Sequence, residues 1–350
     1  MAARPRWLPR PFELFTWGMT ILVVLVLRWQ GLRMDWRTVE FMAAPMLGRL
    51  PTALWLGLAL QGAALVLRRD SLRPWLKAVV SPASAWLWLR LWLVAMAMTY
   101  AYSWLKVSIP LVRRSLFDEQ LWSFDRVIHL GLSPSVFVAE LVHGTPLAGL
   151  LDRWYGLWVT TVLAALAFVF LSPRWDERRN FALACGVLWL VGVWIYLAVP
   201  ALGPCYASPD VFAHLTSEMP SARAGQGTLW SNYARMLAGR DGTLKQFNPY
   251  FGVAAFPSLH VGAHWLFALW ARRRLRALFV PLAVATGLTF LASLATGWHY
   301  AVDGYAGMLL AWLAVRLADR FEPVEERPDG DQEPAEGGLD AGRDAALEPG

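Results

Sequence analysis

Charged side chains and cysteines are scarce in this chain. Only 17% of its 350 residues are charged, against roughly 25% in ordinary soluble domains. There are two cysteines, Cys185 inside an apolar run and Cys205 in a predicted loop, so the sequence predicts no disulfide framework. The low charge argues against a water-soluble domain. The two cysteines do not indicate whether the protein resides in an oxidising or a reducing compartment.

The apolar residues make up 57% of the chain and are gathered into runs. Runs of about 20 residues match a hydrocarbon layer of roughly 30 Å. Many of the 21 tryptophans stand at the ends of these runs, which is typical of side chains at the boundary of water and lipid. We therefore expect an all-α, polytopic membrane bundle of about eight transmembrane helices. The predicted spans lie near residues 12–30, 50–67, 86–109, 154–171, 181–199, 258–271, 277–295 and 300–317.

The positions of lysine and arginine predict the orientation of the bundle. Cytoplasmic connections between spans are typically short and rich in these residues. Basic clusters occur at the N-terminus and in residues 68–77, 172–180 and 272–276, and eight spans place all of them on one side. We therefore expect a multi-pass protein of the cell membrane with both termini in the cytoplasm. Short clusters also explain the net charge of +6 better than a nucleic-acid-binding face does, so no nucleic acid is expected as a partner.

The connections 31–49, 110–153 and 200–257 fall on the opposite, extracytoplasmic side in this arrangement. Within the second of them, residues 115–150 carry apolar side chains at roughly helical spacing, interrupted by charge, glycine and proline. This pattern predicts interfacial or re-entrant helices that pack over the mouth of the bundle.

The composition changes after Phe321, where the chain becomes rich in acidic residues, proline and glycine and free of aromatic residues. Such a segment buries too little apolar surface to fold, so we expect a disordered acidic cytoplasmic tail at residues 319–350. Before it we expect N-terminal transmembrane helices at residues 1–85 and a catalytic membrane domain at residues 86–318. The sequence predicts no oligomeric state.

Two histidines stand where membrane helices are expected to begin. His260 follows the Pro-Ser step of FPSLH, so Ser258 is the expected N-cap and His260 lies in the first turn. The free backbone N–H groups of such a turn form a favourable seat for a phosphate. His299 begins the last span, and Asp303 follows at i+4, so its carboxylate can hold one ring nitrogen and leave the other free to react.

These two histidines are expected to meet, because an apolar run, a basic turn and a second apolar run separate them. At about 1.5 Å per residue each run nearly spans the bilayer, so the chain crosses the membrane and returns. Ionisable side chains at that depth are costly unless they face a cavity or one another, which makes His260, His299 and Asp303 the predicted catalytic group. His260 and His264 have a metal-ligand spacing, but no HExxH glutamate accompanies them, so we expect no metal and no other cofactor.

The pair FPSLH and HYAVDG, each opening a membrane helix, resembles the phosphatidic-acid-phosphatase type 2 superfamily, in particular its inositol phosphorylceramide synthase-like branch. The segments VPALGPCY and FDEQLWSFDRVI resemble the same branch, and the resemblance covers roughly residues 100–318. The resemblance implies a two-step displacement. In it, His299 attacks phosphorus, Asp303 orients the His299 ring, and His260 protonates the leaving oxygen. A nucleophile, an orienting carboxylate and a separate acid are also what this chemistry requires.

Two features of the lipid phosphatases in this superfamily are missing. Ala292 and Ser293 replace the Ser-Arg pair upstream of the second histidine, and no motif of Lys, six residues and Arg-Pro precedes the first. Both absences favour the transferase-like branch. A Lys and an Arg at the right spacing do occur at Lys106 and Arg113, but this pattern runs beyond the end of the third span and lacks the proline, so we interpret it as coincidental.

A transferring phosphate still needs positive charge around it. The predicted substrate-binding residues are basic residues of the outer connections, the capping serine and the two aspartates of FDEQLWSFD, namely Lys245, Arg113, Arg114, Ser258, Asp118 and Asp125. The simplest interpretation of the aspartates, which are seven positions apart, is a solvated helix face. The simplest one for the serine is a helix cap with an incidental phosphate contact, since no G-x-S-x-G elbow surrounds it.

The expected activity is the transfer of a phosphoryl-linked head group between membrane lipids, from a phospholipid donor to a lipid alcohol acceptor. Two alternatives stay open. One is a lipid phosphate or polyprenyl diphosphate phosphatase, in which water resolves the phosphohistidine, and the other is a non-catalytic lipid-binding membrane protein. The transferase and the phosphatase differ in how well residues 110–153 and 200–257 exclude water, which the sequence does not show.

Overall fold

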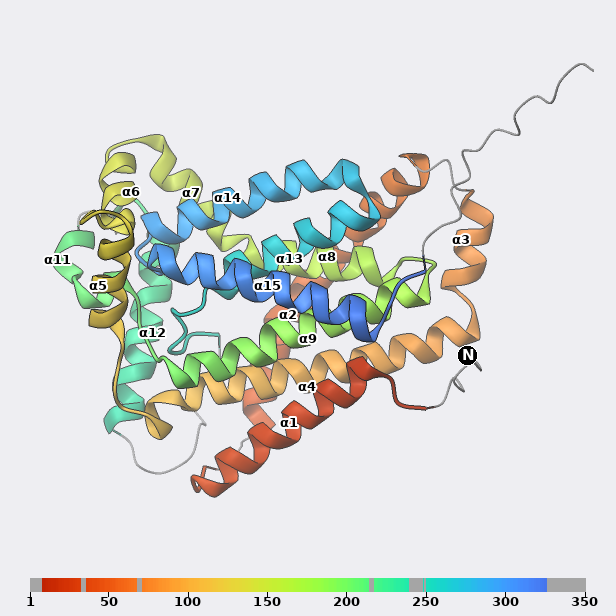
Figure 1. Cartoon of the computed structure of the whole chain (residues 1–350), viewed down its shortest axis with the longest axis horizontal. Helices are drawn as coiled ribbons and strands as arrows, with labels where there is room; N and C mark the ends of the chain where they lie inside the picture. Colours follow the sequence, from red (N-terminus) through yellow and green to blue (C-terminus); the bar gives the residue numbers. More distant parts are fainter. Residues whose placement is uncertain are drawn as a thin grey trace, which may run out of the picture.

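The fold is all-α, as the sequence predicts. A computed structural model describes residues 8–32, 36–67, 71–213, 217–238, 248 and 250–325, and within these ranges no strand occurs. The predicted tail beyond residue 325 lies outside the described residues, as does Lys245. The long helices are α1 (Pro11–Trp29), α2 (Trp36–Leu67), α4 (Pro82–Val112), α8 (Trp158–Phe170), α9 (Trp175–Ala198), α13 (Leu259–Arg274), α14 (Phe279–Ala295) and α15 (Ala301–Phe321). Several of them, among them α1, α4, α9 and α15, run along the long axis of the molecule (Figure 1).

Shorter helices lie at the ends of the long ones. They are α3 (Leu72–Val79), α5 (Asp118–Ile128), α6 (Pro134–Val142), α7 (Pro146–Gly156), α10 (Pro204–Ala207), α11 (Pro209–Phe212) and α12 (Pro220–Ala238). Helices α5, α6, α11 and α12 gather at one end of the bundle, at the left of Figure 1, while α3 lies at the other end. The segment 115–150 therefore contains α5, α6 and the first part of α7, separated by short non-helical connections, and its placement at a membrane interface stays a prediction.

The described helices support five to seven membrane spans, and the predicted count of eight is not confirmed. Five helices are individually long and apolar enough, and two bent pairs, α3 with α4 and α7 with α8, raise the number to seven if each pair counts once. The predicted span 258–271 corresponds to α13, which has only 16 residues. At about 1.5 Å per residue it rises about 24 Å, less than a hydrocarbon layer of roughly 30 Å.

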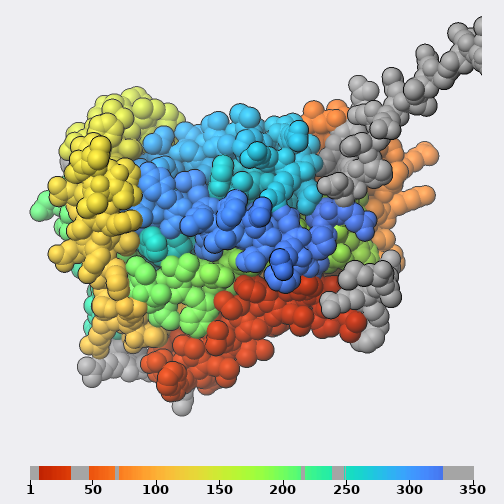
Figure 2. Space-filling model, in the orientation of Figure 1, coloured from red at the N-terminus to blue at the C-terminus, as the bar shows by residue number. Residues whose placement is uncertain are grey.

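Apolar side chains face outward as well as inward. Large exposed ones occur on several long helices, including Leu25 on α1, Val284 on α14, and Leu309 and Trp312 on α15. In the space-filling view, α15, α9 and α1 form adjoining parts of one face (Figure 2). An outward apolar surface of this kind fits a lipid environment, in which helices satisfy their own backbone groups.

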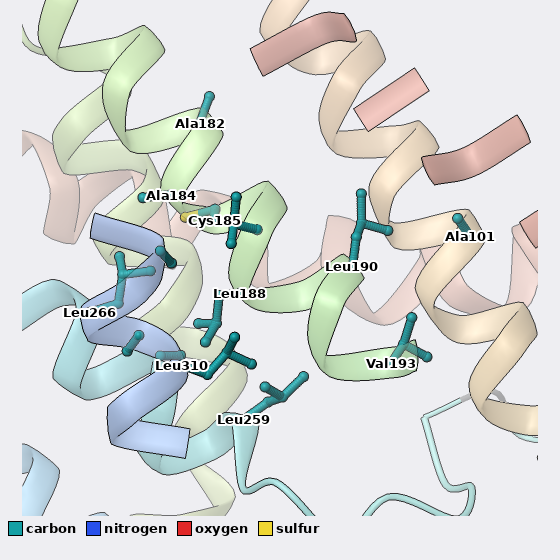
Figure 3. Packing of buried hydrophobic residues seen from close by; sticks show 14 of the residues in the cluster. Ala101, Ala182, Ala184, Cys185, Leu188, Leu190, Val193, Leu259, Leu266 and Leu310 are labelled. Carbon is teal, nitrogen blue, oxygen red and sulfur yellow. The ribbon is translucent and has the colours of Figure 1, made fainter. Parts of the chain in front are cut away.

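The core is centred on α9. In Figure 3, Leu188 on α9 lies beside Leu310 of α15, and Leu190 points toward the helix that carries Ala101. Helices α13 and α15 approach closely through two glycines: a Cβ on Gly262 would lie 2.9 Å from the Gly307 carbonyl oxygen. Small residues at such a contact let two membrane helices pack backbone to backbone.

Candidate active site

The hairpin of α13 and α14 brings the two predicted histidines together. His260 lies in the first turn of α13, where the Ser258 Oγ caps the helix by accepting from the Val261 N–H at 3.5 Å. His299 precedes Tyr300, the N-cap of α15, and the centroids of the two imidazole rings are 5.9 Å apart. The Ser258 N–H also donates to the Asp303 carbonyl oxygen at 2.8 Å, which ties the start of α13 to the first turn of α15. The rings therefore share one end of the bundle.

The hydrogen bonds of His299 define which of its ring nitrogens is free. Its Nδ1 lies 2.8 Å from the Ala255 carbonyl oxygen and 3.3 Å from Oδ2 of Asp303. A carbonyl oxygen can only accept, so Nδ1 must carry the hydrogen. The neutral ring then keeps a lone pair on Nε2. Because His299 is only 3% exposed, this nitrogen is presented in a largely water-free site.

Asp303 orients both the ring and the backbone around it. The same Oδ2 accepts from the Tyr300 N–H at 2.9 Å, so the carboxylate caps the helix that carries it. Its Oδ1 is buried and has no hydrogen-bond partner among the described residues. The i and i+4 spacing predicted a carboxylate beside one ring nitrogen, and the structure has this contact. The catalytic roles of the three residues stay predictions.

His264, the other histidine of α13, has both ring nitrogens engaged. Its Nδ1 lies 3.0 Å from the His260 carbonyl oxygen, and its Nε2 lies 3.2 Å from Oγ1 of Thr161. The residues that the structure describes contain no group of three or more His, Cys, Asp or Glu side chains placed to hold a metal ion. His264 therefore fits a structural role between α13 and α8.

The interpretation of Asp118 and Asp125 as a solvated helix face is wrong. Both point inward from α5, with exposed fractions of 9% and 1%. Their seven-residue spacing puts them on one face, but that face packs against the segments before α15 and after α9, which the spacing alone does not reveal. Burial raises the pKa of both carboxyl groups, and the backbone N–H groups that donate to them oppose this rise.

These two carboxylates hold the segment that presents His299. Asp125 accepts from the N–H groups of Ala301 at 3.2 Å and Val302 at 2.9 Å, which begin α15. Asp118 accepts from Leu202 and Gly203 and from the Tyr300 hydroxyl at 3.1 Å. Their oxygens are thus engaged by the protein, and a substrate-binding role for either stays a prediction. The geometry gives them a positioning role.

The loop after α9 packs directly against the residue before His299. Gly203 has a φ of +112°, which an L side chain rarely adopts, and a Cβ there would overlap the Trp298 carbonyl oxygen. The Cys205 N–H donates to the Gly297 carbonyl oxygen at 2.9 Å. The VPALGPCY segment singled out in the sequence therefore forms one wall of the turn that carries His299.

Among the predicted basic ligands, the described ones lie at the edge of the bundle. Arg113 donates to the Ala198 carbonyl oxygen at 2.5 Å and to Oγ of Ser115 at 3.1 Å, and Arg114 is exposed. Lys106, which the sequence interpretation treats as coincidental, is a more deeply buried cation than either of these arginines. It is 8% exposed, and its Nζ donates to the Tyr250 carbonyl oxygen at 2.8 Å.

The signal in the sequence that points to Lys106 is its spacing from Arg113. Helix α4 continues to Val112, so Lys106 lies within the helix and faces the interior of the bundle. The predicted span 86–109 already contains Lys106, but hydropathy does not show which side of this helix faces the interior of the bundle.

Comparison with known proteins settles the family. A family model described as the PAP2 superfamily matches residues 119–317, more than half of the chain, and this region contains both histidines and Asp303. The chain belongs to the PAP2 superfamily. It is also 32% identical over 154 residues to the inositol phosphorylceramide synthase of Candida albicans, a match that covers 43% of this chain and 31% of that protein. The chain thus matches about a third of the length of that relative, and no solved structure matches it.

Proposed function

We propose that this protein is a membrane enzyme that transfers a phosphoryl-linked head group between lipids through a covalent intermediate on His299. The observation that carries the proposal is the fixed tautomer of His299, whose Nδ1 donates to a carbonyl oxygen while the second imidazole lies 5.9 Å away. One ring is thereby prepared as a nucleophile, and the other is within reach of a phosphate bound between them.

The reaction takes two steps. Nε2 of His299 attacks phosphorus, the bond from phosphorus to the leaving alcohol breaks, and His260 gives its proton to that oxygen. An acceptor hydroxyl then attacks the phosphohistidine, gives its proton to His260 and displaces Nε2. Asp303 stabilises the positive charge on the His299 ring in both steps, and proton transfer of this kind contributes about 10²- to 10⁴-fold to a rate.

Lys106 is the residue we assign to the phosphate. A buried ammonium on α4 would supply positive charge for a transferring phosphoryl group, and the chemistry needs no metal. The outer basic residues Arg113, Arg114 and Lys245 are alternative phosphate ligands. The N-terminus of α13, which Ser258 caps, offers backbone N–H groups that can bind an anion.

The substrate class follows from the relative named above. A phospholipid would be the donor and a lipid alcohol such as ceramide or diacylglycerol the acceptor, with the reaction at the extracytoplasmic face of the cell membrane. The alternative is hydrolysis of a lipid phosphate or polyprenyl diphosphate, in which water replaces the alcohol; membership of a phosphatase superfamily supports it.

One experiment tests both the transferase and the phosphatase reaction. The purified protein is incubated with phosphatidylinositol labelled in its head group, or with labelled phosphatidic acid, with and without ceramide. Label that moves to ceramide supports the transferase, and label released to water supports the phosphatase. The control variant is His299→Ala, in which we expect neither reaction to occur. Turnover that persists in this variant would overturn the covalent mechanism, and a complete lack of turnover in the wild type would favour a lipid-binding protein.

A further inference from the structure

Two aromatic rings contact the His260 imidazole. Tyr155 stacks on it with ring centroids 4.8 Å apart and planes at 26°, and the Trp158 ring lies 4.3 Å away at 51°. Both residues stand at the break between α7 and α8, where the two helices are bent by 45°. Because the chain bends at Leu157, Tyr155 near the end of α7 and Trp158 at the start of α8 both contact the first turn of α13.

His260 and His299 are held in different ways. Hydrogen bonds fix His299 through Nδ1, whereas no hydrogen bond to the His260 ring occurs within the part of the chain that the structure describes. The indole N–H of Trp158 is likewise buried without a partner there, so packing against His260 and Trp189 holds this ring in place. Packing against aromatic rings, rather than hydrogen bonding, therefore sets the orientation of His260.

This difference matches the two chemical tasks. A nucleophile needs one tautomer, with its lone pair always on the same nitrogen. A residue that gives a proton to the leaving oxygen and later takes one from the acceptor hydroxyl must not have that nitrogen bound to the protein. Aromatic packing can fix the plane of an imidazole and leave its nitrogens available, because it uses no hydrogen bond to them.

We propose that Tyr155, by stacking, and Trp158, by tilted ring packing, are positioning residues that hold the His260 ring at the reacting oxygens. This inference rests on the proposed function, since it assumes that His260 transfers the proton. The rings of Tyr155 and Trp158 do not contact the reacting atoms. They act through His260, so their loss should matter only when the leaving oxygen needs a proton.

The test compares two donors that carry the same head group and differ in the leaving group. Phosphatidylinositol releases an alkoxide that must be protonated, whereas 4-nitrophenyl inositol phosphate releases a nitrophenolate that leaves without a proton. The rate of the first turnover is measured for both donors with the wild type, Tyr155→Phe and Tyr155→Leu. Because a small misplacement of a catalytic group can cost up to about 100-fold in rate, Tyr155→Leu should lose about 10- to 100-fold on phosphatidylinositol.

On the nitrophenyl donor the same variant should stay within about 3-fold of the wild type, since no proton transfer is needed. Tyr155→Phe keeps the stacked ring and should retain both rates, and His260→Ala should show the same dependence on the leaving group as Tyr155→Leu. Equal losses of Tyr155→Leu on both donors, or a Phe variant as impaired as the Leu variant, would overturn the proposal.

The proposed function is judged separately by His299→Ala, which should lose the first turnover on both donors. A His299→Ala protein that still cleaves either donor overturns the covalent mechanism, whatever the result for Tyr155. Trp158→Leu provides an independent check of the positioning role, and it should reproduce the selective loss on phosphatidylinositol.

Discussion

The Asp125 carboxylate should be worth several times more stability than an exposed carboxylate on the same helix. It accepts from the buried N–H groups of Ala301 and Val302, which are 0% and 9% exposed. In Asp125→Ala both groups lose their acceptor, and each unsatisfied buried group costs about 1–3 kcal/mol. Burial raises the pKa of Asp125, so removing its charge returns part of that cost. We expect a net loss of about 2–4 kcal/mol.

The assay is thermal unfolding of the purified protein in detergent. A loss of this size should lower the melting temperature by about 5–10 °C. Asp125→Asn keeps one acceptor oxygen and should lose about half as much. The matched control is Glu119→Ala, an exposed carboxylate in the first turn of the same helix, which should change the stability by less than about 0.5 kcal/mol. Wild-type melting of Asp125→Ala, or an equal fall in the Glu119 variant, would refute the reasoning.

Three further predictions concern the site. Asp303→Asn should lower kcat by about 10²-fold rather than more, because a backbone carbonyl still accepts from the nucleophilic ring; the single-turnover rate measures this. Gly307→Ala places a Cβ against the Ser258 carbonyl oxygen and should destabilise the protein by about 1–3 kcal/mol in thermal unfolding, whereas Gly287→Ala, which meets no atom within 4 Å, should not. Lys106→Met should lower kcat/KM for a phospholipid donor by about 10²-fold with an unchanged melting temperature, and Lys106→Arg should restore part of the activity; unchanged kinetics in Lys106→Met would remove it from the phosphate site.

The features that the sequence predicts correctly depend on local order along the chain. Hydropathy runs define the long helices, and Ser258 caps α13 because a serine followed by an apolar run favours a helix start. The meeting of His260 and His299 follows from two apolar runs of similar length joined by a short turn. The contact of Asp303 with His299 follows from a four-residue spacing in the first turn of a helix. Each of these inferences needs only the geometry of one helix or one hairpin.

The tertiary structure alone decides which partner a side chain meets on an element far away in the sequence. Periodicity places Asp118 and Asp125 on one helix face. Only the packing of α5 against the turn before α15 buries that face and lets the two carboxylates accept hydrogen bonds from this turn. Tyr155 carries no motif, and it reaches His260 because α7 and α8 bend at their junction. Lys106 lies within the predicted span 86–109, but only the packing of α4 shows that its side chain is buried. Hydropathy and spacing describe one element at a time, whereas these contacts depend on the angles at which several elements pack.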